Sequence, residues 1–261
     1  MSNVTTVNNS VATVAVSTNY ITAMLENIKN DFLAVNEGMD FDFVNIGTWL
    51  SIDSKGNFVE KDSNDAVVAN YTDSFDVVVG YGEKRWTLWG EQKSPEEGLL
   101  IVAKRDKEEA EQELTAWLQE NPDAQCRYNL QSLELRYLAY IVPVSTLSPD
   151  DFPKIYLMSF PLTTTISWGK YAQGIYLGNG KKVLIPARTG VNRVVTRMTT
   201  SEKSSGNNKW TGIDFEAVGL FDPRDYGIDW DPKKAAASAP NEATTAATAA
   251  EEKVAAGAES F

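Results

Sequence analysis

The stretch VVTRMTTSEKSSGNNKWTGIDFEAVGL occupies residues 194–220. Its two ends are rich in β-branched and aromatic residues, and the polar segment 201–208 between them predicts a turn. Arg197 lies on the first predicted strand, whereas Lys209 and Trp210 lie on the second. The stretch therefore predicts a β-hairpin whose turn is flanked by cations and an indole ring, an arrangement that suits a ligand to be wrapped.

Other segments also predict strands. Residues 47–61, GTWLSIDSKGNFVEK, alternate apolar and polar side chains around the turn signal at 54–57 and predict a second hairpin. Two further strands, SFDVVVGYG (74–82) and KRWTLWG (84–90), are predicted to be joined through the flexible Gly80 and Gly82. The last two predicted strands are LELRYLAYIVPVS (133–145) and KIYLMSF (154–160), and one of these two is apolar enough to be buried on both faces.

Two amphipathic helices are predicted from hydrophobic periodicity. Residues 20–35 carry one apolar stripe and have Asn19 near the cap position. Residues 104–120 repeat apolar side chains at helical spacing and end at Asn121 and Pro122. With 261 residues, of which 43% are hydrophobic, the chain is long enough to bury a core. The prediction is a mainly β protein of the α+β type.

The net charge of −12 hides a strong segregation along the chain. Residues 168–213, here called the basic block, contain eight Lys and Arg residues and a single acidic residue, Glu202. Four aromatic residues are interleaved with these cations. The candidate binding residues of the basic block are Trp168, Lys170, Tyr171, Tyr176, Lys181, Lys182, Arg188, Arg193, Arg197, Lys203, Lys209 and Trp210.

Cations that alternate with aromatic side chains favour a surface that binds a phosphate backbone and stacks on exposed bases. Residues 174–186, GIYLGNGKKVLIP, predict a hairpin that turns at 178–180, so the basic block is expected to form two hairpins. The alternative interpretation is structural. Aromatic residues in β-rich segments usually lie in the core, and cations in an acidic protein can pair with its own carboxylates. The sequence leaves both interpretations open.

Composition argues against most kinds of catalytic site. The chain has no histidine, which excludes Ser-His-Asp and Cys-His nucleophiles and zinc sites that contain histidine. Two carboxylate pairs, Asp40 with Asp42 and Glu96 with Glu97, have no recognisable ligand spacing. We interpret both pairs as solvated loop charge.

The single cysteine, Cys126, excludes an internal disulfide. Its neighbour Arg127 could lower the pKa of the thiol, but a passive, half-buried cysteine is the simpler interpretation. We therefore expect a protein that is not an enzyme and that needs no metal or cofactor.

The two ends of the chain differ in composition from the body. Residues 1–18 are rich in Ser, Thr, Asn and Val and predict a flexible arm, whereas 232–261 are rich in Ala, Thr and Glu and predict a disordered acidic tail. The β-rich domain is expected to span residues 19–231. No apolar run reaches 18 residues and no secretory signal is evident, so we expect a cytoplasmic protein with no membrane partner.

The order of these features resembles that of the single-stranded DNA-binding proteins encoded by bacteriophages. The resemblance rests on the internal helix KEEAEQELTAWLQE (107–120), the basic-aromatic hairpin RMTTSEKSSGNNKWTGIDFEAVG (197–219) and the terminal AESF (258–261). It extends over roughly residues 40–222 and concerns organisation more than a fixed motif. The tail departs from the family because its last eleven residues carry few acids and include Lys253.

The resemblance implies an OB-like antiparallel β-barrel with one or two packed helices. It also implies sequence-tolerant binding of single-stranded DNA in replication, recombination or repair, in the host cytoplasm if the protein is phage-encoded. Glu259 and Phe261 at the tail tip would bind replication or recombination proteins. The alternative is a non-enzymatic phage structural or adaptor protein, and a homo-oligomer is compatible with either.

Overall fold

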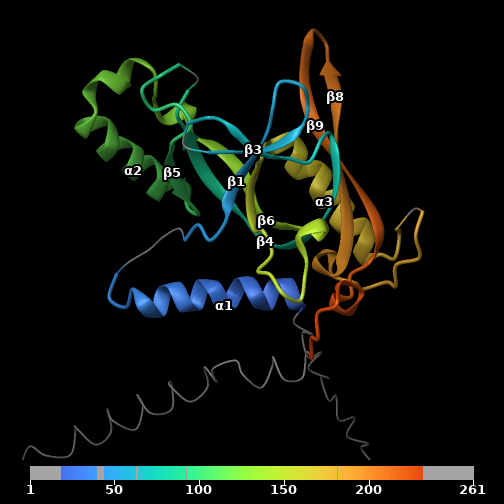
Figure 1. Cartoon of the computed structure of the whole chain (residues 1–261). Coiled ribbons are helices and arrows are strands. Elements are labelled where there is room, and N and C mark those ends of the chain that lie inside the picture. The colour runs from blue at the N-terminus through green and yellow to red at the C-terminus, as the bar shows by residue number, and fades with distance from the viewer. Residues whose placement is uncertain (1–18, 40–43, 63, 92, 181, 232–261) are drawn as a thin grey trace, which may run out of the picture. The chain divides into compact units, whose positions relative to one another are not determined.

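The computed structural model describes residues 19–39, 44–62, 64–91, 93–180 and 182–231, so the predicted arm and tail lie outside the described residues. The described chain is mainly β (Figure 1). Its strands are β1 (Thr48–Ile52), β2 (Phe58–Lys61), β3 (Val67–Asn70), β4 (Ser74–Trp89), β5 (Leu100–Lys104), β6 (Glu134–Pro143), β7 (Tyr156–Phe160), β8 (Val194–Ser205) and β9 (Asn208–Leu220). Its helices are α1 (Tyr20–Val35), α2 (Lys107–Glu120) and α3 (Leu162–Tyr176), with short 3₁₀ turns between elements.

These strands form one sheet in the order β3-β2-β1-β7-β6-β4-β8-β9, and β5 pairs with β4 beside this path. The neighbours are antiparallel except β1 and β7, which are parallel. The sheet is curled and open, so it forms a half-barrel. The sequence-based prediction of a mainly β fold is confirmed, whereas the described part has three α-helices where one or two were expected.

The curl brings the β1–β2 turn against β8, although these elements are far apart in the strand order. The backbone N–H of Thr200 donates to the carbonyl of Asp73 at 2.8 Å. The Thr200 hydroxyl donates to the carbonyl of Gly56 in the β1–β2 turn at 2.7 Å. A large apolar cluster, which includes Phe58 and Met198, fills the inside of the curl.

The two faces of the sheet are covered by different helices. Helix α1 packs Ile21 and Leu25 against one face, and α3 packs Trp168 against the cluster inside the curl. Helix α2 lies beside β5 (Figure 1). The two elements share a third apolar cluster, which includes Leu114 and Val102. The inner face of the curled sheet is therefore covered by α3, and the β8–β9 hairpin contributes side chains to the same apolar cluster.

Strand β4 corrects one prediction. Residues 74–82 and 84–90 were expected to form two strands joined by glycines, but Ser74–Trp89 is one strand with a register shift between Val79 and Tyr81. A Cβ at Gly80 would lie 2.3 Å from Cδ1 of Leu25. Gly80 therefore serves close packing of α1 on β4.

Segment 162–177 corrects a second prediction. The hairpin expected over residues 174–186 is wrong, because Leu162–Tyr176 forms α3. Thr164, Trp168 and Ile175 are buried, and with Tyr171 they follow helical spacing toward the core. Burial of this stripe outweighs the poor helix propensity of three threonines and two glycines. The hairpins predicted over 47–61 and 194–220 are confirmed.

Candidate functional site

The basic block is divided among α3, the loop that follows it, and the β8–β9 hairpin (Figure 1). Lys181, Glu259 and Phe261 lie outside the described residues. Because α3 replaces one expected hairpin, the remaining candidate residues do not lie on two adjacent β-ribbons. The burial and the partners of these candidate residues differ from one residue to the next.

Two of the aromatic candidates belong to the core. Trp168 is 5% exposed and packs in an edge contact on Phe215, with ring centroids 5.1 Å apart. Tyr171 stacks on the same ring at 5.8 Å, and its hydroxyl lies 2.8 Å from the Thr196 hydroxyl. Burial raises the pKa of Tyr171 to about 12. The expectation that both rings face bound bases is therefore corrected: in this structure they hold α3 on the sheet.

Three other candidates on or after α3 are exposed. Tyr176 is 55% exposed at the end of the helix. Lys170 lines a 710 Å³ pocket between α3 and β9. Arg188 lies in the following loop with a left-handed backbone, φ 65°. Neither Lys170 nor Arg188 forms an ion pair with another described residue, so both remain available to an anion.

Four cations of the basic block are paired with carboxylates. The pairs are Lys182 with Glu216 (2.7 Å), Arg197 with Asp76 (2.7 Å), Lys203 with Asp214 (2.7 Å) and Lys209 with Glu202 (2.9 Å). Asp76 raises the pKa of Arg197 further by hydrogen bonding and charge. The charge count along the chain suggested a continuous positive surface. The four ion pairs show instead that these cations do not form one unpaired positive channel.

The hairpin residues also point to both faces of the β8–β9 ribbon. Lys203 lies directly opposite Trp210 in the ladder, whereas Lys209 lies opposite Ser204. Because side chains alternate along a strand, Lys203 and Trp210 share one face and Lys209 lies on the other. Arg193 is exposed at the entry to β8.

A pocket of 460 Å³ lies between β1 and β9, at the open side of the half-barrel. Its walls are mainly apolar and include two indole rings. Trp49 and Trp89 meet edge to face, with centroids 4.6 Å apart. Its lining includes Trp49, Ser51, Ile52, Trp89, Met158, Ser159, Thr211 and Ile213.

A second pocket of 460 Å³ lies next to the first. It is lined by the β1–β2 turn, including Lys55, and by Lys209 and Trp210 of the hairpin. Both pockets are lined by Thr211, so they lie next to each other along β9; the two pockets together, from Trp89 to the hairpin, are here called the β1–β9 groove. Two of the predicted residues, Lys209 and Trp210, line this groove.

The sequence-based prediction missed most of the groove. Neither Trp49 nor Trp89 belongs to the basic block or to the binding residues predicted from it. Both rings are only partly buried. The one local signal is in β1, where Trp49 near the start of the strand is followed by the polar Ser51. This pattern indicates an aromatic ring that is not fully buried. The meeting of β1 with β9 is a tertiary feature that no local pattern specifies.

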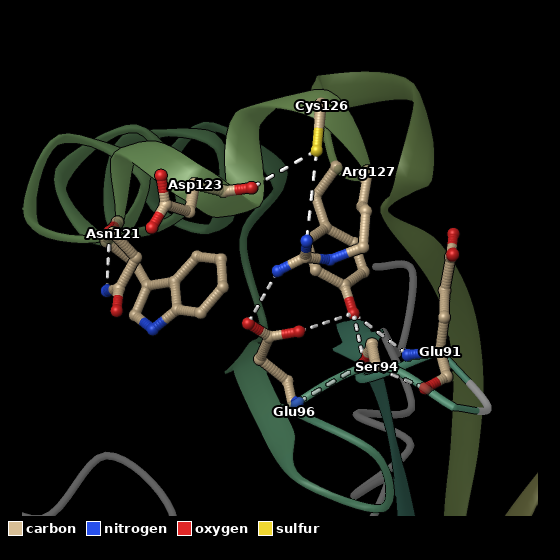
Figure 2. A network of polar contacts seen from close by, with 9 residues as sticks. Glu91, Ser94, Glu96, Asn121, Asp123, Cys126 and Arg127 are labelled. Carbon is tan, nitrogen blue, oxygen red and sulfur yellow. Dashed lines mark hydrogen bonds and ion pairs between the residues drawn. The ribbon is translucent and has the colours of Figure 1, made fainter.

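Glu96 and Cys126, one of the carboxylate candidates and the single thiol, belong to a separate network near α2 (Figure 2). The Arg127 guanidinium donates to Glu96 at 2.8 Å and also approaches the Cys126 sulfur at 3.8 Å. Loss of solvation raises the pKa of Glu96, but hydrogen bonds from Ser94 and Arg127 outweigh it and hold that pKa below its usual value. Glu96 therefore ties its loop to Arg127. Cys126 is exposed, not half-buried.

Within the described residues, no cluster of acidic and cysteine side chains could hold a metal ion. Asp40 and Asp42 lie outside that part of the chain. None of the described helices is long and apolar enough to cross a membrane.

The chain matches no protein-family model, no curated protein and no solved structure.

Proposed function

We propose that the protein binds single-stranded DNA without strong sequence preference and without catalysing a reaction, and that the strand lies in the β1–β9 groove. The observation that carries this proposal is the groove itself, in which two adjacent pockets are lined by partly buried tryptophans and by lysines. Bases stack on aromatic side chains whatever their identity, and lysines attract the phosphates. This function assigns the lysines and tryptophans of the groove to different parts of the same ligand.

The ion pairs on the hairpin weaken the positive field but leave phosphate binding open. Lys209 and Glu202 are both mostly exposed. An exposed pair of this kind is worth about 1 kcal/mol or less, so a phosphate can replace the carboxylate at small cost. Lys55, in the β1–β2 turn on the opposite wall, is exposed. The two lysines can therefore contact the backbone of one strand.

In this proposal the half-barrel is an OB-like body adapted by insertions, and the protein acts in the cytoplasm during replication, recombination or repair of DNA, as expected for a phage-encoded protein. The tail, with Glu259 and Phe261, would recruit partner proteins. The open side of a curled sheet is where OB-folds bind oligonucleotides, which supports placing the strand there.

The test is a titration of a fluorescently labelled oligonucleotide with the full chain, followed by anisotropy at two salt concentrations. We expect binding that weakens roughly tenfold between ~50 and ~200 mM salt, as for a few phosphate contacts. The double variant Lys55→Ala and Lys209→Ala should bind several-fold more weakly. Lys29→Ala, on α1 and outside the groove, is the matched control. Absence of binding at low salt would refute the proposal.

A structural or adaptor role is the second candidate, and the outer face of α3 favours it. Leu162, Ile166, Tyr176 and Leu177 are large, exposed and apolar on a helix whose one charged residue is Lys170. Exposed apolar surface of this kind is typical of an assembly interface. Filter binding of DNA separates the two candidates, since an assembly role alone predicts no retention.

A further inference from the structure

Strands β1 and β7 form a wedge. Their parallel ladder contains Thr48 opposite Tyr156 and Trp49 opposite Leu157, and no further pair follows in the described strands. Beyond that point β1 remains paired with β2, and β7 remains paired with β6. The two strands diverge while each keeps one open edge toward the other. Backbone donors and acceptors therefore face the gap.

The 460 Å³ pocket of the β1–β9 groove occupies this gap. Ile52 from β1, Met158 from β7 and Ile213 from β9 line it, so its walls come from three strands. The edge-to-face pair of Trp49 and Trp89 forms the end away from the hairpin. The pocket is mainly apolar and, at 460 Å³, large enough for a heterocycle.

Two residues of the lining, Trp89 and Ser159, each carry a buried polar atom that has no partner among the described residues. The indole nitrogen of Trp89 and the hydroxyl of Ser159 are buried without a hydrogen bond. Leaving a buried donor unsatisfied costs about as much as a lost hydrogen bond, and such atoms are rare in native proteins. Because both residues line one pocket, their unpaired atoms point to a ligand that enters it and completes their hydrogen bonds.

We propose that this wedge takes one nucleobase of the bound strand, a step that rests on the proposed function. The base lies between the apolar walls. A ring nitrogen or carbonyl oxygen of the base accepts a hydrogen bond from the Trp89 N–H, and the Ser159 hydroxyl forms a hydrogen bond with the adjacent polar group of the base. Thymine offers a carbonyl beside an N–H and a methyl group for the apolar wall. A phenyl ring such as that of Phe261 has no acceptor and leaves both atoms unsatisfied.

Entry of the base requires a small rearrangement. Both polar atoms are closed off from solvent by neighbouring side chains. The Trp89 ring is only partly buried, so it can turn from its edge contact with Trp49 and present its N–H to the pocket. The signal of the Trp89 indole proton should therefore report occupancy directly.

The experiment uses the full chain labelled with ¹⁵N, whose seven tryptophans each give one indole N–H signal. Trp89→Phe assigns the Trp89 signal, and the six other signals report whether that variant is folded. We expect an oligonucleotide of thymidines to shift the Trp89 signal, and an abasic oligonucleotide of equal length to leave it in place. Trp89→Phe and Ser159→Ala should each weaken thymidine binding about fivefold and leave binding of the abasic strand unchanged.

The outcomes separate this inference from the proposed function. If the thymidine strand binds but the Trp89 signal stays in place and neither variant weakens binding, the base pocket is refuted while DNA binding stands. If no oligonucleotide binds, both fail. If Phe261→Ala in the full chain shifts the Trp89 signal without DNA, the pocket holds the tail, and the base assignment is overturned.

Discussion

The ammonium group of Lys203 lies 2.7 Å from Oδ1 and 2.8 Å from Oδ2 of Asp214, on the neighbouring strand of the β8–β9 hairpin. The aliphatic part of Lys203 passes over Gly212, where a Cβ would stand 2.7 Å from the Lys203 Cγ. The same carboxylate accepts a hydrogen bond from Ser201 at 2.6 Å. Asp214 thus holds in place a cation that the sequence suggested was free for phosphate.

Removing the hairpin carboxylates should strengthen DNA binding. In the double variant Glu202→Gln and Asp214→Asn, Lys209 and Lys203 lose their carboxylate partners and two negative charges leave the neighbourhood of the strand. We expect the affinity for an oligonucleotide to rise several-fold at low salt, and the gain to shrink as salt screens the charges. Anisotropy titration measures both effects.

The matched control for this variant is the double variant Glu26→Gln and Asp31→Asn, at two exposed carboxylates on α1. It changes the net charge in the same direction but lies outside the β1–β9 groove. An equal gain from this control would mean that total charge, not the position of the carboxylates, governs binding.

Trp210 is the second target. Trp210 is partly exposed at the hairpin end of the groove, on the ribbon face opposite Lys209, so a strand that wraps around the ribbon there can stack a base on it. Trp210→Ala should cost about 1–3 kcal/mol of binding free energy. Trp210→Phe, which keeps a stacking ring, should restore most of it. A Trp210→Ala protein that binds as tightly as the parent would remove this residue from the site.

Helices α1 and α2 could be predicted because their local signals agree. The Asn19 side chain accepts from the Ile21 N–H at 2.8 Å, which caps α1 at the expected residue. Helix α2 begins at Lys107, three residues later than predicted, because Asp106 is its cap and Leu100–Lys104 belongs to β5. Capping and periodicity are local properties, so the sequence contains them.

Helix α3 was missed because two signals in the sequence conflict. Gly178 and Gly180 give a strong turn signal, and it drew the preceding residues into a predicted hairpin. The spacing of Thr164, Trp168 and Ile175 was the better guide, since it matches a helix that buries one side. That stripe stabilises a helix only when it packs against the sheet, a tertiary contact that the sequence alone does not show.

The prediction that the cations of the basic block are unpaired was wrong for a different reason. The basic block stops one residue before Asp214, so a count along the chain omits the carboxylate that neutralises Lys203. Asp76, the partner of Arg197, is 121 residues away in sequence. The wedge between β1 and β7 likewise depends on strands far apart in the chain. Strand pairing decides which charges meet, and no window of sequence shows it.

The position of Trp168 predicts a large effect on stability. Its ring is buried among Phe160, Tyr171 and Phe215, so Trp168→Ala should lower the free energy of unfolding by about 3–5 kcal/mol. Trp168→Phe should cost less, because a smaller ring leaves a smaller cavity. Urea unfolding measures both. A stability unchanged by Trp168→Ala would show that the ring is exposed in solution, as the sequence-based interpretation assumed.

Burial also makes stability depend on alkaline pH. The pKa of Tyr171 is raised by burial to about 12, above the value near 10 of an unfolded chain. Because the folded state holds the phenol proton more tightly, this contribution is fully present below pH ~10 and is lost as pH rises from ~10 to ~12. For Tyr171 the loss amounts to about 2 kcal/mol.

Urea unfolding near pH 8 and near pH 11 tests this dependence with two matched variants. Tyr171→Phe loses the hydrogen bond to Thr196, so it should be about 1–3 kcal/mol less stable than the parent near pH 8. Its further loss near pH 11 should be smaller than that of the parent, because one buried phenol no longer ionises. Tyr176→Phe, at an exposed tyrosine, should match the parent at both pH values. An equal alkaline loss in the parent and in Tyr171→Phe would mean that the phenol of Tyr171 is not held in the core as the contacts with Thr196 and Phe215 indicate.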